Sequence, residues 1–137
     1  MKKYEILEHK ADLKIRAFGK TKEEVFLNML IGMSESMKGS EARRPEEKIR
    51  REVKIKSLDL PTLLVDFLSE VLYLTQVNKE IYRDVKFKEL SDTEIRGEIF
   101  GQKVERFGED IKAVTYHSLV VRQKKDRSWE AIVLFDI

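Results

Sequence analysis

The sequence predicts an α+β domain in two layers, with a mainly antiparallel sheet and two helices packed on one of its faces. Two stretches carry helix start signals ahead of broad apolar stripes, one at Thr21 and one around Asp59. Alternation of apolar and polar residues, typical of half-buried strands, occurs before, between and after these stretches. The order is therefore strands, helix, strand, helix and then several strands.

The composition favours one domain over residues 1–137, which is long enough to bury a core without disulfides. The charged fraction is 38%, but the net charge is only +2, which argues against an arm that binds polyanions. The absence of Cys excludes disulfides, thiolate catalysis and Cys-based zinc sites. With no apolar signal core at the N-terminus and no uninterrupted apolar run as long as a membrane span, we expect a soluble cytoplasmic protein.

The first half of the chain is expected to hold three strands and a helix. Short strands cover residues 4–7 and 13–17, and Thr21 with Glu24 forms a capping box at the start of a helix that ends before Gly39. The charged segment 40–47 contains Pro45 and is predicted to be a loop. A third strand follows over residues 49–56.

The second half is expected to hold a long helix and several strands. Ser57 or Asp59 caps the helix, Pro61 lies in its first turn, and its apolar face fades near Asn78. The strands that follow occupy residues 82–90, 94–99, 111–121 and 129–137, with turns at 91–93 and 124–128 and no assignment for most of 101–110.

The final stretch combines a buried pattern with two negative charges. Five of the last six residues, from Ile132 on, are apolar, so the stretch should lie within a sheet. It would hold the Asp136 side chain and the α-carboxylate of Ile137 at one sheet end, where two close carboxylates cost free energy without a cation or donor. Asp12, at the start of the second strand, is a third acid. Together they would suit a hard divalent cation, although exposed and solvated is the commonest state of Asp.

His9 and His117 are the other candidates for chemistry, as metal ligands or as an acid–base pair. Alternation along the strand 111–121 places His117 on the face of Thr115 and Leu119, where a hydrogen-bonded structural role is the commoner one. Lys112 opens the same strand, and by pattern alone it is a surface cation. No glycine-rich phosphate loop, nucleophile elbow or HExxH motif is present, so a site has to be assembled by the fold.

Three motifs together resemble the archease family: His9-Lys-Ala-Asp-Leu13, Lys112-Ala-Val-Thr-Tyr-His117 and the ending Phe135-Asp-Ile137. The stretch from Leu60 to Leu74 is similar to the long second helix of that family. The resemblance covers essentially the whole chain, and its motifs occur in the right order.

The resemblance implies an accessory protein rather than an enzyme. Archeases activate the RtcB-type tRNA-splicing RNA ligase by promoting its guanylylation and multiple turnover. By resemblance, Asp12, Asp136 and the terminal carboxylate of Ile137 bind a divalent cation, with calcium expected, and Lys112 is functional beside them. His9 and His117 belong to the same motifs. The implied partner is the ligase, with no sequence-specific nucleic-acid binding and no membrane.

The chain departs from the family pattern at three positions. Lys10 replaces a Thr in the first motif, and the Asp and His that the family commonly has near Gly101 and Glu105 are absent. Two other functions stay open: a general chaperone or modulator of RNA-processing proteins, and a metal-dependent hydrolase with His117 or His9 as its base. The ligase activator is favoured because the motifs gather acids without supplying a nucleophile.

Overall fold

The computed structural model describes residues 2–9, 11–39 and 48–137, without the side chains of residues 8 and 9. The predicted loop 40–47 lies outside the described residues. The described chain contains two helices and seven strands in the expected order. They are β1 (Tyr4–His9), β2 (Asp12–Gly19), α1 (Lys22–Met37), β3 (Ile49–Lys56), α2 (Leu60–Asn78), β4 (Glu80–Leu90), β5 (Glu94–Lys103), β6 (Ala113–Gln123) and β7 (Trp129–Asp136).

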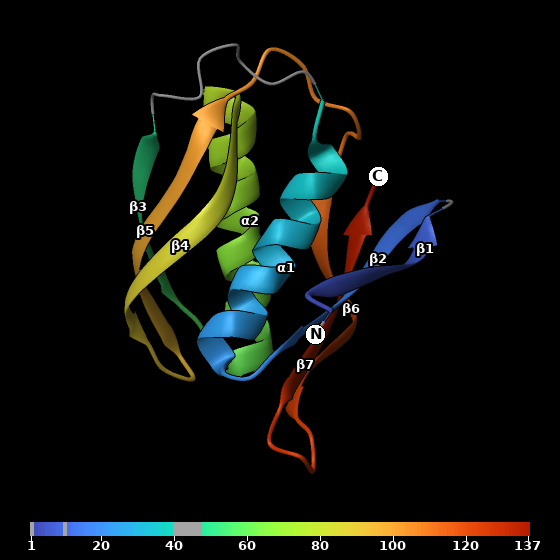
Figure 1. Ribbon diagram of the computed structural model, residues 1–137, viewed down its shortest axis with the longest axis vertical. Helices are drawn as coiled ribbons and strands as arrows, with labels where there is room; N and C mark the ends of the chain where they lie inside the picture. The colour runs from blue at the N-terminus through green and yellow to red at the C-terminus, as the bar shows by residue number, and fades with distance from the viewer. Residues whose placement is uncertain (1, 10, 40–47) are drawn as a thin grey trace.

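The strands form two antiparallel sheets with the helices between them (Figure 1). One sheet has the order β1-β2-β7-β6 and the other the order β3-β5-β4. α1 contacts β2 and β4, while α2 contacts β6 and β3, so each helix touches both sheets. The α+β class and the antiparallel pairing are confirmed, and the finding that differs is the division of the strands into two sheets instead of one.

The width of the apolar surface on the helices explains the second sheet. A helix that packs on one sheet needs an apolar stripe of about 100°. α2 buries eight of its 19 residues, among them the consecutive Leu63, Leu64 and Val65, which point in different directions around the helix axis. One sheet cannot cover such a surface, so a sheet lies on either side, and each sheet keeps its other face in water.

Both helices begin at the predicted caps. Thr21 Oγ1 accepts a hydrogen bond from the Glu24 N–H at 3.1 Å, and Asp59 Oδ1 accepts one from the Thr62 N–H at 2.9 Å. Asp59, rather than Ser57, is therefore the cap of α2. Within the described residues, α2 is the one helix whose length and mean hydropathy would suit a membrane, a test that the core helix of a water-soluble protein also passes.

β6 departs from the alternation expected along it. Its register with β7 shifts between Thr115 and Val120, so that the four residues between them face a single residue of β7. Ser118 in this bulge has a φ of 56°, in the left-handed region. Tyr116 and His117 are adjacent in the sequence, and yet both side chains are exposed. Thr115 pairs with Leu134 and Val121 with Ala131, which lie on opposite faces of β7, so the single alternation expected along residues 111–121 is interrupted at the bulge. The placement of His117 on the face of Thr115 stays a prediction.

A buried carboxylate links β4 to β3. Glu80 is fully buried, and the Arg51 guanidinium donates to both of its oxygens, at 3.0 and 2.9 Å. The Tyr82 hydroxyl donates to the same carboxylate. Burial alone would raise the pKa of Glu80, but the hydrogen bonds from Arg51 and Tyr82 outweigh it and lower that pKa. Burial and the neighbouring Glu80 raise the pKa of Tyr82 to about 12.

Candidate functional site

β7 lies in the interior of its sheet, between β2 and β6. Ala131, Val133 and Phe135 are fully buried against the helices, which confirms the prediction of a buried final strand. Because strand side chains alternate between faces, Asp136 points to the outer face of the sheet. Its side chain is exposed.

Asp12 lies directly opposite Asp136 in the pairing of β2 with β7. Side chains at directly opposite positions share a face of the sheet, with their Cβ atoms about 4.5–5.5 Å apart. Like charges in this arrangement are destabilising. The fold thus brings together two acids that are 124 positions apart in the sequence, and Ile137 follows Asp136 with its side chain packed against the core.

Lys112 lies at the same end of the sheet. Its backbone N–H donates to the Asp136 carbonyl oxygen at 2.7 Å, just before β6 begins at Ala113 opposite Asp136. The Lys112 side chain is exposed, and it makes no ion pair in the described part of the chain. The position next to the two acids agrees with what the family resemblance implies, while the role of Lys112 stays a prediction.

Other acids on the outer face of this sheet are paired. Glu130 is contacted by Arg122 at 2.8 Å and by Arg16 at 3.7 Å, and Arg16 also contacts Glu5 at 3.0 Å. Neither Asp12 nor Asp136 has a partner among the described side chains, those of residues 2–7, 11–39 and 48–137. No described side chain therefore neutralises the negative charge at this end of the face.

The donor set at this end fits a hard cation. Its described members, Asp12 and Asp136, supply carboxylate oxygens, which are ligands that calcium and magnesium prefer. The described His, Cys, Asp and Glu side chains form no group of three that could hold a metal ion. The α-carboxylate of Ile137, next in sequence to Asp136, is the candidate for a third donor.

No described side-chain contact places either histidine beside Asp12 and Asp136. His117 lies in the β6 bulge with an exposed side chain, and its backbone N–H donates to Thr115 Oγ1 at 3.3 Å. The backbone of His9 pairs with Leu13, one residue from Asp12, and its side chain lies outside the described residues. Lys10 also lies outside them.

The two departures in the second half of the chain have different structural settings. Gly101 pairs with Tyr82 on β4, and a Cβ at this position would lie 2.0 Å from the Ile81 carbonyl oxygen. No side chain fits there without a backbone shift, so the chain cannot carry an Asp at residue 101 in this conformation. Glu105 is exposed just after the end of β5.

One polar cluster was not anticipated from the sequence. Asp66 on α2 accepts hydrogen bonds from Ser57 Oγ at 2.6 Å and from the Tyr116 hydroxyl at 2.5 Å. The bond to Asp66 is the main reason why the pKa of Tyr116 is raised. Asp66 and Tyr116 are 50 residues apart, and only the packing of α2 against β6 brings them together, so no local pattern could have indicated the contact.

Known proteins resemble the chain over its whole length. The model of the Archease protein family (MTH1598/TM1083) matches residues 4–137. A protein archease from Methanosarcina barkeri is 38% identical over 144 residues, which cover 99% of this chain and 97% of that protein. A protein archease from Pyrococcus furiosus is 32% identical, with 100% of both chains covered.

Two solved structures share the fold. The solution structure of protein 1598 from Methanobacterium thermoautotrophicum has a TM-score of 0.74 and 27% identity, with 100% of both chains covered. The crystal structure of an archease and possible chaperone from Thermotoga maritima has a TM-score of 0.67 and 19% identity, over 97% of this chain and 96% of that one. The family resemblance seen in the motifs is confirmed, and this chain belongs to the archease family.

Proposed function

We propose that this protein activates an RtcB-type tRNA-splicing RNA ligase, promoting its guanylylation and multiple turnover. In this proposal a divalent cation, with calcium expected, is held by Asp12, Asp136 and the α-carboxylate of Ile137. The observation that carries the proposal is the pair of exposed carboxylates at directly opposite positions of β2 and β7, which have no side-chain partner within the part of the chain that the structure describes. Two like charges at such positions destabilise the fold unless a bound cation compensates for their repulsion.

In nucleotidyl transfer, a pair of carboxylates can hold the divalent cation that the reaction needs. A divalent cation supplies neutralisation of the charge on transferring phosphates. In the proposal, Asp12 and Asp136 provide anionic oxygens at the exposed ends of β2 and β7, where a partner protein has access to them. Lys112, placed beside Asp136 by a backbone hydrogen bond, adds a cationic side chain that can meet a phosphate oxygen.

The proposal assigns the chemical step to the ligase and makes this protein an accessory factor. Among the described residues, Leu13 and Ala113, which lie beside the acids in the strand pairing, carry no nucleophile. A general chaperone role is the second candidate, because the Thermotoga maritima relative is described as a possible chaperone. That role predicts suppression of aggregation that does not depend on Asp12 or Asp136.

The test is a guanylylation assay with purified ligase, labelled GTP and this protein. We expect Asp136→Asn and Asp12→Asn to lose the stimulation while keeping the thermal unfolding profile of a folded protein. Asp92→Asn is the matched control, because Asp92 is also an exposed acid, paired with Lys22 at 2.9 Å in the turn between β4 and β5. It should stimulate as the wild type does.

A second variant isolates the terminal carboxylate. Adding three residues after Ile137 moves that carboxylate away and leaves both aspartates in place. We expect the extended protein to lose stimulation and to bind calcium more weakly in a titration calorimeter. Full stimulation by the extended protein would show that the terminal carboxylate is not a ligand, and full stimulation by the Asp136→Asn variant would remove the whole site from the proposal.

A further inference from the structure

α2 carries an exposed apolar and aromatic stripe on the side away from the core. Tyr73 is 57% exposed and Val77 is 61% exposed, and they lie one turn apart on the same side of the helix. Tyr116, from the bulge of β6, is 58% exposed and is tied to α2 by its bond to Asp66. We name Asp66, Glu70, Tyr73, Val77 and Tyr116 the α2 stripe.

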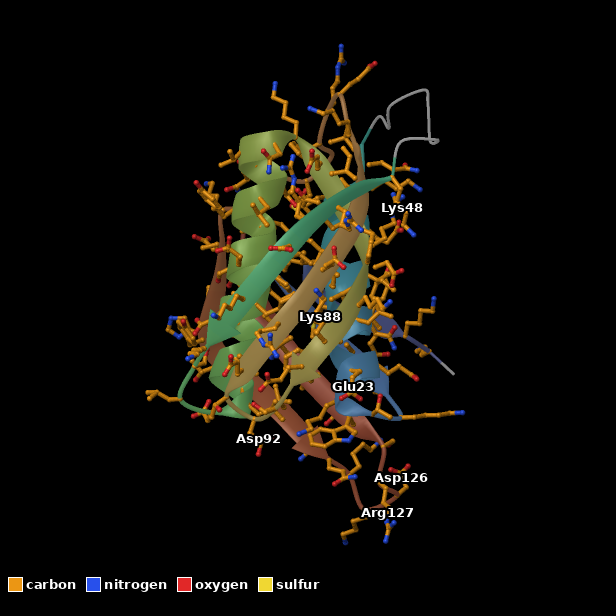
Figure 2. The ribbon with its side chains drawn as sticks, turned by 90° about the vertical axis from the view of Figure 1, so that its left-hand side faces the viewer. Glu23, Lys48, Lys88, Asp92, Asp126 and Arg127 are labelled. Atoms are coloured by element: carbon orange, nitrogen blue, oxygen red, sulfur yellow. The ribbon has the colours of Figure 1, made fainter. Side chains whose placement is uncertain are left out.

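The composition of this helix is that of an interface. Protein interfaces are enriched in aromatic residues and depleted in Lys relative to the rest of the surface. Lys and Arg make up 27 of the 137 residues, yet none occurs between Leu60 and Asn78, and the first one after them is Lys79 at the C-cap. By contrast, the outer face of the β3-β5-β4 sheet carries exposed Lys side chains, such as Lys88 on β4, which is labelled in Figure 2.

The charge of the stripe indicates what it would bind. Glu70 is half-buried and makes no ion pair within the described ranges, so an incoming cation could pair with it at a partly desolvated position. A second copy of this chain placed on the stripe across a twofold axis would bring the acidic groups of both copies together, which is unfavourable. The complementary surface is one with Arg or Lys beside an apolar groove.

The stripe is continuous with the candidate site. Gln76 on α2 donates from Nε2 to the Ile111 carbonyl oxygen at 3.0 Å. The next residue, Lys112, donates its backbone N–H to Asp136. A protein bound along the C-terminal half of α2 would thus lie beside the sheet end that holds Lys112 and Asp136.

From these observations we infer that the α2 stripe is the docking surface for a protein partner with a basic, apolar-lined groove, and that the partner is the ligase of the proposed function. The inference rests on that proposed function. It separates two roles within one molecule: the stripe provides affinity, and the acids at the end of β7 act on the bound partner.

The test compares affinity with stimulation. Purified ligase is immobilised, and the dissociation constant of each variant is measured by biolayer interferometry beside the guanylylation assay. The double variant Tyr73→Ser/Val77→Lys alters exposed side chains only, so it should fold as the wild type does. We expect its affinity to fall at least about tenfold, since exposed aromatic anchors dominate interface energies. Glu70→Lys should weaken binding further than Glu70→Gln, because it places a cation against the basic groove.

Two controls keep the roles apart. Leu58→Ala removes a side chain that is 92% exposed just before α2 and outside the stripe, and it should leave the affinity unchanged. Asp136→Asn should bind the ligase within about threefold of wild type and fail to stimulate it.

The outcomes discriminate between the inference and the function on which it rests. Unchanged affinity of the double variant would overturn the docking surface and leave the proposed function standing. Equal loss of affinity in Leu58→Ala would also overturn it, because exposed apolar area in general would then be the cause. If wild-type protein neither binds nor stimulates the ligase, both proposals fall.

Discussion

Two carboxylate sites in this molecule are built in opposite ways. Glu80 is fully buried and is bound by Arg51 and Tyr82. Asp12 and Asp136 face each other in solvent without a side-chain partner among the described residues. The first arrangement ties strands together, and the second leaves charge open to a ligand. The partners of an acid, rather than its presence, therefore indicate its role, and the comparison predicts opposite effects when each charge is altered.

Removal of the cation beside Glu80 should have the largest effect. Arg51→Met leaves a buried carboxylate without its counterion, which destabilises proteins by about 3–5 kcal/mol. We expect the free energy of unfolding, measured by urea denaturation, to fall by about 3 kcal/mol. Arg50→Met is the control, because Arg50 is 66% exposed in its pair with Glu98 and surface pairs contribute about 0–1 kcal/mol. Equal losses in the two variants would contradict a structural role for Glu80.

Calcium should stabilise the protein through the open pair. At a concentration one hundred times the dissociation constant, a ligand that binds only the folded state contributes about 2.7 kcal/mol. We expect the melting temperature to rise with added calcium in the wild type and in Glu80→Gln. Asp12→Asn should lose the rise, and a rise that persists in it would place the ion elsewhere.

The lowered pKa of Glu80 should be detectable in the pH dependence of the free energy of unfolding. Its pKa is lowered in the folded state, so the unfolded chain binds more protons as the pH falls below the ordinary Glu value of about 4.3. The stabilisation is complete above that value and is lost as the pH falls through the lower folded value. The unfolding free energy of the wild type should therefore drop more steeply than that of Glu80→Gln between about pH 5 and pH 3. Parallel curves would contradict the lowered pKa.

Neutralising one acid of the open pair should have the smallest effect, with the opposite sign. In the presence of a chelator, Asp136→Asn relieves the repulsion from Asp12 and should stabilise the protein by about 0.5 kcal/mol. The measurement is the denaturation midpoint in EDTA. A clear loss of stability would show that the pair already has a stabilising partner.

Local signals in the sequence predicted most of the fold. The caps Thr21 and Asp59 marked both helices because capping depends on neighbouring residues alone. Alternation likewise placed β3 at residues 49–56 as the structure has it. The division into two sheets was missed because it depends on which distant strands pair, and the pairing of β2 with β7 leaves no trace in either stretch.

The candidate site was predicted by motif resemblance, and its geometry could not be. Asp12 and Asp136 were named as a pair, but their direct opposition follows from the register of two distant strands. The single alternation predicted along residues 111–121 was wrong because periodicity assumes an unbroken strand, and the bulge at Ser118 interrupts it. The contact between Tyr116 and Asp66 was overlooked because neither residue belongs to a local sequence pattern that indicates it.

The interior position of β7 also has a consequence for the order in which the molecule can assemble. A chain made from its N-terminus produces β1, β2 and α1 first, but β2 gains its second neighbour only after residues 129–136 have been made. The β3, β4 and β5 strands and α2 are contiguous in the sequence and can associate earlier. Contacts between distant segments slow folding, so closure of the β1-β2-β7-β6 sheet should be the late step, and the two acids would meet only then.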